Sequence, residues 1–396
     1  MRLKLIALLL TIFTTTGMIS NANAEPSSQP KEWTFLIYLN GNNNLDSYGK
    51  MNINQMEKVG SNARINIVVQ WASLENGKTQ RLYITKDNDT STVTSKVVQD
   101  MGAVDMGDYH SVINFVKWGA ENYPAQHYFV DIWDHGSGWH FKPGETMKDI
   151  SWDETTGNHI TTEQLATALT ESSKIIGHKI DIYGSDACLM AMVEVENLMT
   201  DAVGVYVGSE ETEPGDGWPY DAFLASWNKL PAGAPATAVG AALTQEYANY
   251  YKDKSSNVTL SAFDLSYLAP FTQSIKKFST SFKKLNTSDF KKINQAAKDS
   301  THFASEDYVD FGDFLDHVKA LKISKLDKSA ISEINDNAKK FVISSNNVGF
   351  PKVHGASIWI PTDSSTYSQY ADRYSQLSFE HDTQWGDVAK LIATAQ

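Results

Sequence analysis

The stretch Asp181-Ile-Tyr-Gly-Ser-Asp-Ala-Cys-Leu-Met190 decides how this sequence of 396 residues can be interpreted. Its beginning, together with the residues from Lys179, alternates polar and apolar side chains, which predicts a β-strand. From Leu189 the apolar residues recur at the spacing of a helix with a wide buried face. Cys188, the only cysteine, therefore lies at a predicted strand-to-helix junction. A helix N-terminus there is expected to lower the pKa of the thiol, because free N–H groups favour a thiolate.

A second stretch places a histidine at the end of another strand. Residues 127–133 are mostly apolar and predict a buried strand, which is followed by Asp134-His-Gly-Ser-Gly-Trp139. Two strand ends in one parallel sheet can bring His135 and Cys188 within hydrogen-bond reach, as a thiol nucleophile and its base require. Taken singly, either residue has a plain structural alternative: a small buried hydrophobe for the cysteine and a hydrogen-bonded core residue for the histidine.

The order of the predicted elements indicates the fold class. Between the two strands, Thr161 and Gln164 form a capping-box pattern that predicts a helix start. Strand, helix, strand and helix in succession indicate an α/β fold with parallel strands joined by right-handed crossovers. The second half of the chain is predicted to be mainly helical, with one helix over residues 328–344.

The motifs His135-Gly-Ser-Gly-Trp139 and Asp186-Ala-Cys-Leu-Met190 resemble the two catalytic motifs of the clostripain family of cysteine peptidases. The resemblance extends over about residues 33 to 390 in the right order. It includes Trp33–Leu39, Ser209–Trp218, Tyr308–Phe314 and His354–Pro361. It implies a caspase-like three-layer α/β/α fold with a mostly parallel central sheet and an added helical C-terminal part. We accordingly expect a catalytic core over residues 33–255 and a mainly helical part over 256–396.

The chemistry expected from these motifs is that of a cysteine endopeptidase. Cys188 is the predicted nucleophile that forms a thioester, and His135 is the predicted base that later protonates the leaving amine. The backbone N–H groups of Gly136 and Cys188 are the predicted oxyanion donors. No third acid is nominated, because Asp134 adjoins His135 and neighbours on a strand point to opposite faces.

An acid near the nucleophile suggests the substrate. Asp186 shares the face of Cys188 in extended chain, where it disfavours a thiolate unless a cation arrives with the substrate. The resemblance likewise implies that the matching acid faces a pocket for Arg or Lys at P1. The alternative is that Asp186 caps the following helix. Asp216 is a second candidate for this pocket, although a turn rich in Gly and Asp needs no function, and Ser209 is a weaker candidate.

Two accessory features concern the polar segment between the motifs. Asp149, Asp153 and Glu154 could bind calcium, although their spacing does not match an EF-hand and a solvated acidic loop is the simpler interpretation. No other cofactor is expected. Lys142 and Lys148 are possible sites of self-cleavage for an enzyme that cuts after basic residues.

The N-terminus and the composition indicate the compartment and exclude some partners. Residues 1–24 have the positive start, the short apolar core and the small-residue cleavage site of a signal peptide, and residues 25–32 predict a disordered leader. The mature protein is therefore expected to be secreted or periplasmic, without stable membrane insertion. A net charge of −13 disfavours nucleic acid as a partner. The expected partners are peptides or proteins that contain Arg or Lys, bound by a monomer.

Rival classes were weighed against the peptidase interpretation. A metal hydrolase is disfavoured because His135 and His140 do not form a His-Glu-x-x-His pattern. A serine hydrolase is disfavoured because no Gly-x-Ser-x-Gly occurs around Ser137 or Ser185. The remaining alternative is an exported, non-catalytic peptide-binding protein on the same caspase-like scaffold.

Overall fold

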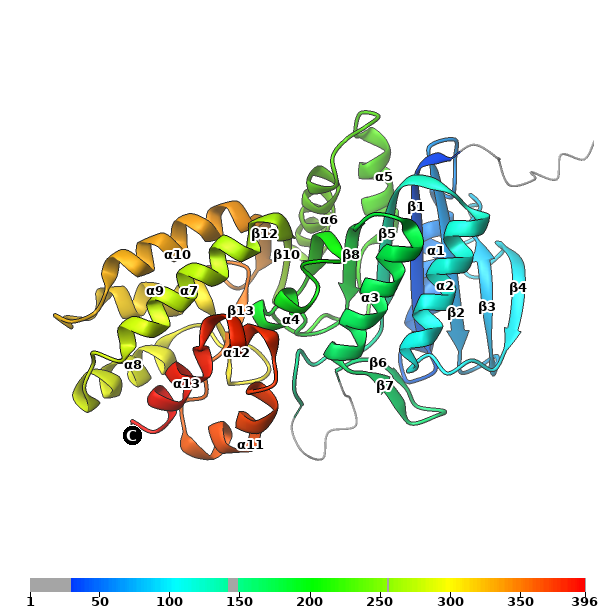
Figure 1. Cartoon of the computed structure of the whole chain (residues 1–396). Helices are drawn as coiled ribbons and strands as arrows, with labels where there is room; N and C mark the ends of the chain where they lie inside the picture. The colour runs from blue at the N-terminus through cyan, green and yellow to red at the C-terminus, as the bar shows by residue number, and fades with distance from the viewer. Residues whose placement is uncertain (1–29, 142–148, 255, 396) are drawn as a thin grey trace, which may run out of the picture.

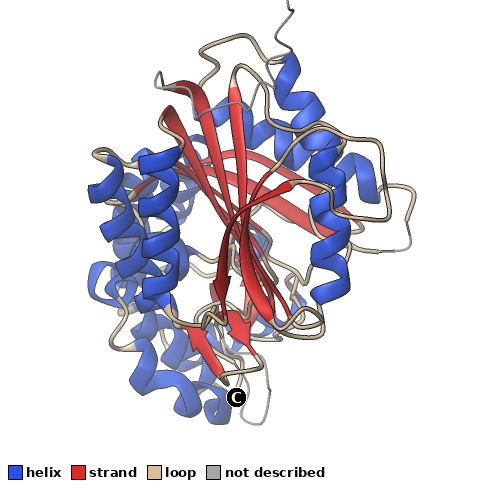
Figure 2. Ribbon diagram, turned by 90° about the vertical axis from the view of Figure 1, so that its right-hand side faces the viewer, coloured by secondary structure: helices blue, strands red, loops and turns tan. Residues whose placement is uncertain are grey.

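The computed structural model describes residues 30–141, 149–254 and 256–395, and its centre is a sheet of nine strands between layers of helices (Figures 1 and 2). The strand order is β12-β10-β9-β8-β5-β1-β2-β3-β4. These strands span Lys31–Gly41 (β1), Ile65–Ser73 (β2), Lys78–Tyr83 (β3), Lys96–Gly102 (β4), Ala125–Trp133 (β5), Ile180–Asp186 (β8), Val203–Gly208 (β9), Val258–Asp264 (β10) and Val342–Val348 (β12).

The middle of the sheet is parallel and its two flanks are antiparallel. Strands β9, β8, β5, β1 and β2 pair in parallel, whereas β3 and β4 on one flank and β10 and β12 on the other pair antiparallel with their neighbours. The carboxyl ends of the central strands therefore meet at one edge, as the sequence predicted. This edge is where open α/β sheets place their ligands.

Both faces of the central strands are buried under helices. In β1, Leu36 and Tyr38 pack into one core, while Phe35 and Ile37 pack into the other. Each such core excludes water from one face of the sheet, which is the main source of its stability. The first core lies under α2 (Tyr109–Asn122), α3 (Thr162–Ile176) and α4 (Val193–Leu198), and the second under α1 (Asp46–Glu57), α5 (Tyr220–Lys229) and α6 (Ala236–Tyr251).

The C-terminal helices gather beyond the β12 side of the sheet, at the left of Figure 1. They span Leu268–Phe282 (α7, after the 3-10 turn Leu265–Tyr267), Thr287–Asp299 (α8), Phe311–Ala320 (α9), Lys328–Phe341 (α10), Ser364–Tyr374 (α11), Ser378–Thr383 (α12) and Trp385–Ala393 (α13). Two small antiparallel pairs complete the fold: β11 (Tyr308–Asp310) with β13 (Ser357–Trp359), and β6 (Ile150–Asp153) with β7 (Asn158–Ile160). Across the described ranges, no helix combines the length and apolarity needed to cross a bilayer.

One predicted element differs from the structure at the edge of the sheet. The helix predicted over residues 328–344 ends at Phe341, and the chain continues directly as β12. Every residue of β12 is half-buried, so the strand shows no alternation of buried and exposed positions. Pairing with β10 decides its conformation, and that partner lies about eighty residues earlier in the chain. The prediction was therefore wrong because tertiary pairing outweighs local propensity here.

Candidate active site

The ends of β5 and β8 bring the two sequence motifs together. The strands are parallel neighbours, and Trp133 pairs with Asp186 in register. His135 and Cys188 each follow two residues after this pair. The N–H of Asp134 donates to the carbonyl of Asp186 at 3.2 Å, so the two chains stay side by side past the last strand residues.

A cavity of about 230 Å³ opens where these two strands end. His135 and Cys188 both line it, together with Asp186 and Glu213. Its other walls come from the turn after β1, represented by Leu45, and from the glycine-bearing segment after Glu213. The cavity therefore combines a thiol, an imidazole and two carboxyl groups, which come from three separate places in the chain.

Cys188 lies in a turn that other segments hold in place, and not at a helix N-terminus. The helix predicted from Leu189 is wrong, because α4 begins only at Val193. Leu189 has a φ of 64°, a conformation that side chains rarely adopt, and its N–H donates to the carbonyl of Glu211 at 3.2 Å. The N–H of Glu213 donates to the Cys188 Sγ at 3.2 Å. These tertiary bonds replace the hydrogen bonds that a helix would have supplied.

Burial of Cys188 keeps its thiol protonated. Desolvation raises the pKa of the thiol to about 11, and the nearby charges of Glu211 and Asp186 act in the same direction. The expected lowering of this pKa by a helix N-terminus does not occur, because α4 starts five residues further on. At neutral pH the Cys188 side chain is therefore a neutral thiol.

His135 is also neutral at physiological pH. Burial lowers the pKa of its imidazole to about 4. Its Nε2 lies 2.7 Å from the Oδ1 of Asn44, in the turn after β1. The sequence did not single out Asn44, because nothing in the residues around it indicates that this turn meets His135.

Asp186 lies beneath the cavity and is held by α5 and the segment before it. Its Oδ2 accepts hydrogen bonds from the Tyr220 hydroxyl at 2.9 Å and from the Trp218 N–H at 3.3 Å. Burial raises the pKa of the carboxyl to about 7, against the lowering effect of Tyr220. The alternative role as a helix cap is wrong, since the N-cap of α4 is Met192.

Glu213 supplies a second buried carboxyl, which the sequence analysis did not single out. Burial raises its pKa well above the ordinary value, and the charge of Asp186 raises it further. Two adjacent carboxyl groups in a dry site cannot both ionise at low cost. A cation in the cavity would therefore stabilise the charged forms of both carboxyl groups. The signal in the sequence was present but ambiguous, because Glu210, Glu211 and Glu213 stand close together in one loop.

Asp216 and Ser209 are not brought into the cavity. The Asp216 carboxylate binds Lys254 Nζ at 2.7 Å and the Tyr250 hydroxyl at 2.9 Å, and the hydrogen bond from Lys254 lowers its pKa. Ser209 is buried, and its hydroxyl donates to the carbonyl of Glu211 at 2.9 Å. Its own carbonyl accepts from the Ala191 N–H at 2.9 Å, so Ser209 supports the cysteine turn from behind.

Gly136 lies directly against the cysteine turn. A Cβ at this position would come within 2.5 Å of the Cys188 carbonyl oxygen. A side chain here would therefore push the two motifs apart, which explains the glycine beside His135. This contact places the backbone of Gly136 next to that of Cys188, the two residues predicted to donate to the oxyanion.

The calcium site considered from the sequence does not form. The Asp149 carboxylate is buried and binds Arg373 Nη2 at 2.7 Å, and the Asp153 carboxylate accepts from Asn42 at 2.9 Å. Within the part of the chain that is described, no cluster of three or more His, Cys, Asp or Glu side chains could hold a metal ion. The predicted self-cleavage sites Lys142 and Lys148 lie outside the described residues.

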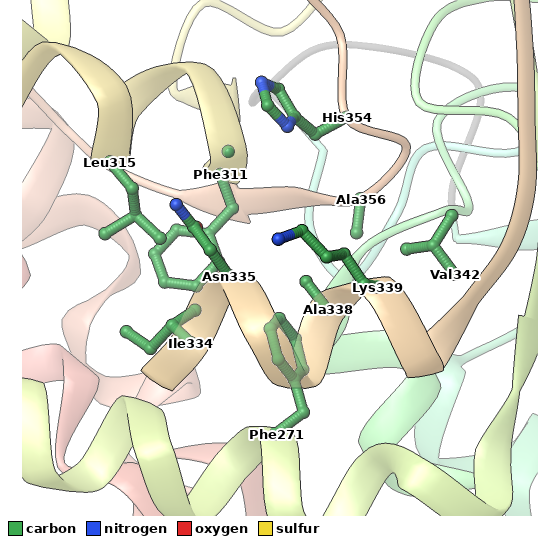
Figure 3. A pocket seen from close by; sticks show the side chains of 11 residues that line it. Phe271, Phe311, Leu315, Ile334, Asn335, Ala338, Lys339, Val342, His354 and Ala356 are labelled. Atoms are coloured by element: carbon green, nitrogen blue, oxygen red, sulfur yellow. The ribbon is translucent and has the colours of Figure 1, made fainter. Parts of the chain in front are cut away.

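A larger cavity of about 400 Å³ lies among α7, α9 and α10 (Figure 3). Its walls are mainly apolar, with Phe271, Phe311 and Ile334 among them. Lys339 and His354 are the ionisable residues of its lining, which includes neither a cysteine nor a carboxylate. This cavity has no nucleophile, so the smaller cavity is the candidate active site.

Comparisons with known proteins bear on the family and the fold of this chain. The model of a family described as "Clostripain family" matches residues 37–391. A secreted C11 cysteine protease from Bacteroides thetaiotaomicron, solved with an irreversible peptide inhibitor, has a similar fold: TM-score 0.70 and 20% identity over 89% of this chain and 99% of that one. An inactive zymogen C11 protease from Parabacteroides distasonis also has a similar fold, with a TM-score of 0.70 and 18% identity over 90% of this chain and 99% of that one. No curated protein matches.

Proposed function

Starting from the fact that this chain belongs to the clostripain family of cysteine peptidases, we propose that it is an exported endopeptidase that cleaves after Arg or Lys through Cys188 and His135. The observation that carries this proposal is the cavity shared by a thiol, an imidazole and two buried carboxyl groups. Perturbed titratable groups that converge in one cleft are typical of catalytic sites.

The proposed reaction begins from neutral partners. His135 takes the proton of the Cys188 thiol while Sγ attacks the scissile carbonyl carbon, and the resulting imidazolium gives that proton to the leaving amine. A thioester forms, and water then hydrolyses it with His135 again acting as base. The N–H groups of Gly136 and Cys188 are proposed to hold the oxyanion, each contributing on the order of 3 kcal/mol to transition-state stabilisation.

The preference for a basic P1 residue follows from Asp186 and Glu213. Burial raises the pKa of both carboxyl groups, and the charge of Asp186 raises the pKa of Glu213 further. An entering guanidinium or ammonium group would lower the pKa of both carboxyl groups, which would then ionise and pair with it. The cation would also offset the Asp186 charge that raises the pKa of Cys188, so a basic substrate assists its own cleavage.

Export is proposed from residues 1–24, whose charge and apolar pattern match a signal peptide. The related protease from B. thetaiotaomicron is described as secreted, which supports the same compartment here. The N-terminal sequence of the protein purified from its natural host should begin at Glu25. An intact Met1 on that protein would rule export by this route out.

The decisive experiment compares the wild type with Cys188→Ala and His135→Ala on reporter peptides that differ only at P1: Arg, Lys, norleucine or Glu. Wild type should cleave the Arg and Lys peptides, and either variant should lose about 10⁴-fold or more in kcat. Cleavage by Cys188→Ala at the wild-type rate would eliminate the cysteine mechanism. Tight peptide binding without turnover by the wild type would favour the non-catalytic binding protein.

A further inference from the structure

We propose that Asn44 is a positioning residue of the peptidase reaction, whose amide oxygen fixes His135 with its proton on Nε2 and leaves Nδ1 as the base for the Cys188 thiol. This inference rests on the proposed function and deepens it. It assigns a role to a residue that neither catalytic motif contains.

The contact that carries the assignment joins the Asn44 Oδ1 to the His135 Nε2 at 2.7 Å. An amide oxygen accepts hydrogen bonds and cannot donate them, so the nitrogen that meets it carries the proton. A neutral imidazole has only one N–H, and burial keeps this imidazole neutral. Nδ1 therefore retains the lone pair, which is the group that a thiol proton requires.

The position of Asn44 relative to His135 is itself fixed by its neighbours. The Asn43 side chain donates to the Asp134 carboxylate at 2.6 Å, and the Asn40 side chain donates to the same carboxylate at 3.0 Å. Asp134 directly precedes His135 in the chain. The turn after β1 and the end of β5 are therefore fastened together beside the contact, which holds the backbone of Asn44 close to His135 although the Asn44 side chain itself is exposed.

An amide suits this site better than a carboxylate would. The ionisable groups that line the cavity together with His135 are Asp134 from the end of β5, Cys188 and Asp186 from the end of β8, and Glu213 from the following loop. A carboxylate in place of Asn44 would add a further negative charge and stabilise the imidazolium. The amide orients the ring without adding charge, so a basic substrate remains the cation that meets Asp186 and Glu213.

The kinetic test uses Asn44→Ala and Asn44→Asp, with Asn76→Ala, in the exposed turn after β2, as the matched control. Asn44→Ala should lower kcat about 10- to 100-fold on an Arg reporter peptide, with KM within twofold and an unchanged thermal midpoint. Asn44→Asp should keep more activity, but its charge should move the acidic limb of the kcat/KM profile upward by about one pH unit. The control should match the wild type.

A second readout does not depend on turnover. Side-chain ¹⁵N shifts of His135, assigned by comparison with His135→Ala, should show the proton on Nε2 in the wild type and a mixture of tautomers in Asn44→Ala. A proton on Nδ1 in the wild type would overturn the assignment, and so would full kcat in Asn44→Ala or a loss matched by a fall in thermal midpoint. If the wild type does not cleave peptides, the proposed function fails, while the ¹⁵N result still decides the role of Asn44.

Discussion

Two cavities described above differ in chemistry more than in size. The cavity at the ends of β5 and β8 has about 230 Å³ and contains the carboxyl groups of Asp186 and Glu213. The cavity among α7, α9 and α10 has about 400 Å³ and a mainly apolar wall. Its Lys339 is an exposed side chain, with its Nζ 3.3 Å from Asp336. Buried ionisable groups, and not volume, therefore distinguish the candidate active site.

The physical reason is the cost of burying a carboxyl group. Folding gains nothing from placing Asp186 and Glu213 in a dry site, because their charged forms lose hydration and repel one another. The apolar cavity has no such cost and represents only imperfect packing between helices. Each of the following experiments tests whether the smaller cavity serves catalysis and whether the larger one affects only stability.

The largest effect is expected from removing the charges of the smaller cavity. Asp186→Asn should reduce kcat/KM on an Arg peptide about 100-fold, because a desolvated charge pair loses one partner. Adding Glu213→Gln should reduce it further, whereas cleavage of a norleucine peptide should change little. The measurement is the Arg-to-norleucine ratio of kcat/KM in the two variants. An unchanged ratio would show that the carboxyl groups do not bind P1.

Although Asp186→Asn should lower activity, it should raise the stability of the folded protein at alkaline pH. Asp186 has a pKa of about 7 in the folded protein against an ordinary value of 3.8, so the folded state binds more protons between these values. Stability from this group therefore falls as pH rises from about 4 to about 7 and stays low above that range. The change in thermal midpoint from wild type to Asp186→Asn should therefore be more favourable at pH 8 than at pH 4. Glu213→Gln should shift the thermal midpoint in the same direction, because burial also raises the pKa of Glu213.

A smaller effect is expected in the reactivity of the free thiol. With the pKa of Cys188 raised from 9.0 to about 11, iodoacetamide at pH 8 should alkylate it about 100-fold more slowly than an unstructured cysteine peptide. The rate should rise about tenfold per pH unit up to about pH 11. Fast alkylation at pH 7 would mean that the site holds a preformed thiolate, and the neutral-pair mechanism would then be abandoned.

The smallest effect is expected in the larger cavity. Ala338→Leu should fill part of it and stabilise the protein by about 0.5–2 kcal/mol, as cavity filling commonly does. Turnover of the Arg peptide should stay within twofold of the wild type. The measurements are urea denaturation and steady-state kinetics on the same preparation. A large loss of kcat without a loss of stability would show that this cavity communicates with the active site.

The sequence predicted the features that depend on neighbouring residues, but it did not predict those that depend on contacts between segments far apart in the chain. The strand ends at His135 and Cys188 were predictable, because the first follows a mostly apolar run and the second follows a run that alternates polar and apolar residues. The capping box was confirmed, with the Gln164 N–H donating to the Thr161 hydroxyl at 3.1 Å. Both signals lie within a few residues of the feature they predict.

The features that were missed all depend on a partner far away in the chain. The turn at Leu189 replaces a predicted helix because its backbone bonds to Glu211. Asn44 meets His135 across 91 positions, and no periodicity records such a contact. Glu213 was overlooked in favour of Asp216, because only the folded loop reveals that Glu213 faces inward while Asp216 pairs with Lys254.

The loop of residues 209–213 supplies a wall of the cavity at the ends of β5 and β8, and it also holds the turn that carries the Cys188 thiol. Grafting a foreign loop here to change the substrate preference would therefore also disturb the position of the Cys188 thiol. New specificities should arise more readily through side-chain exchange within the existing loop than through changes in its length, which constrains both laboratory engineering and natural divergence of such enzymes.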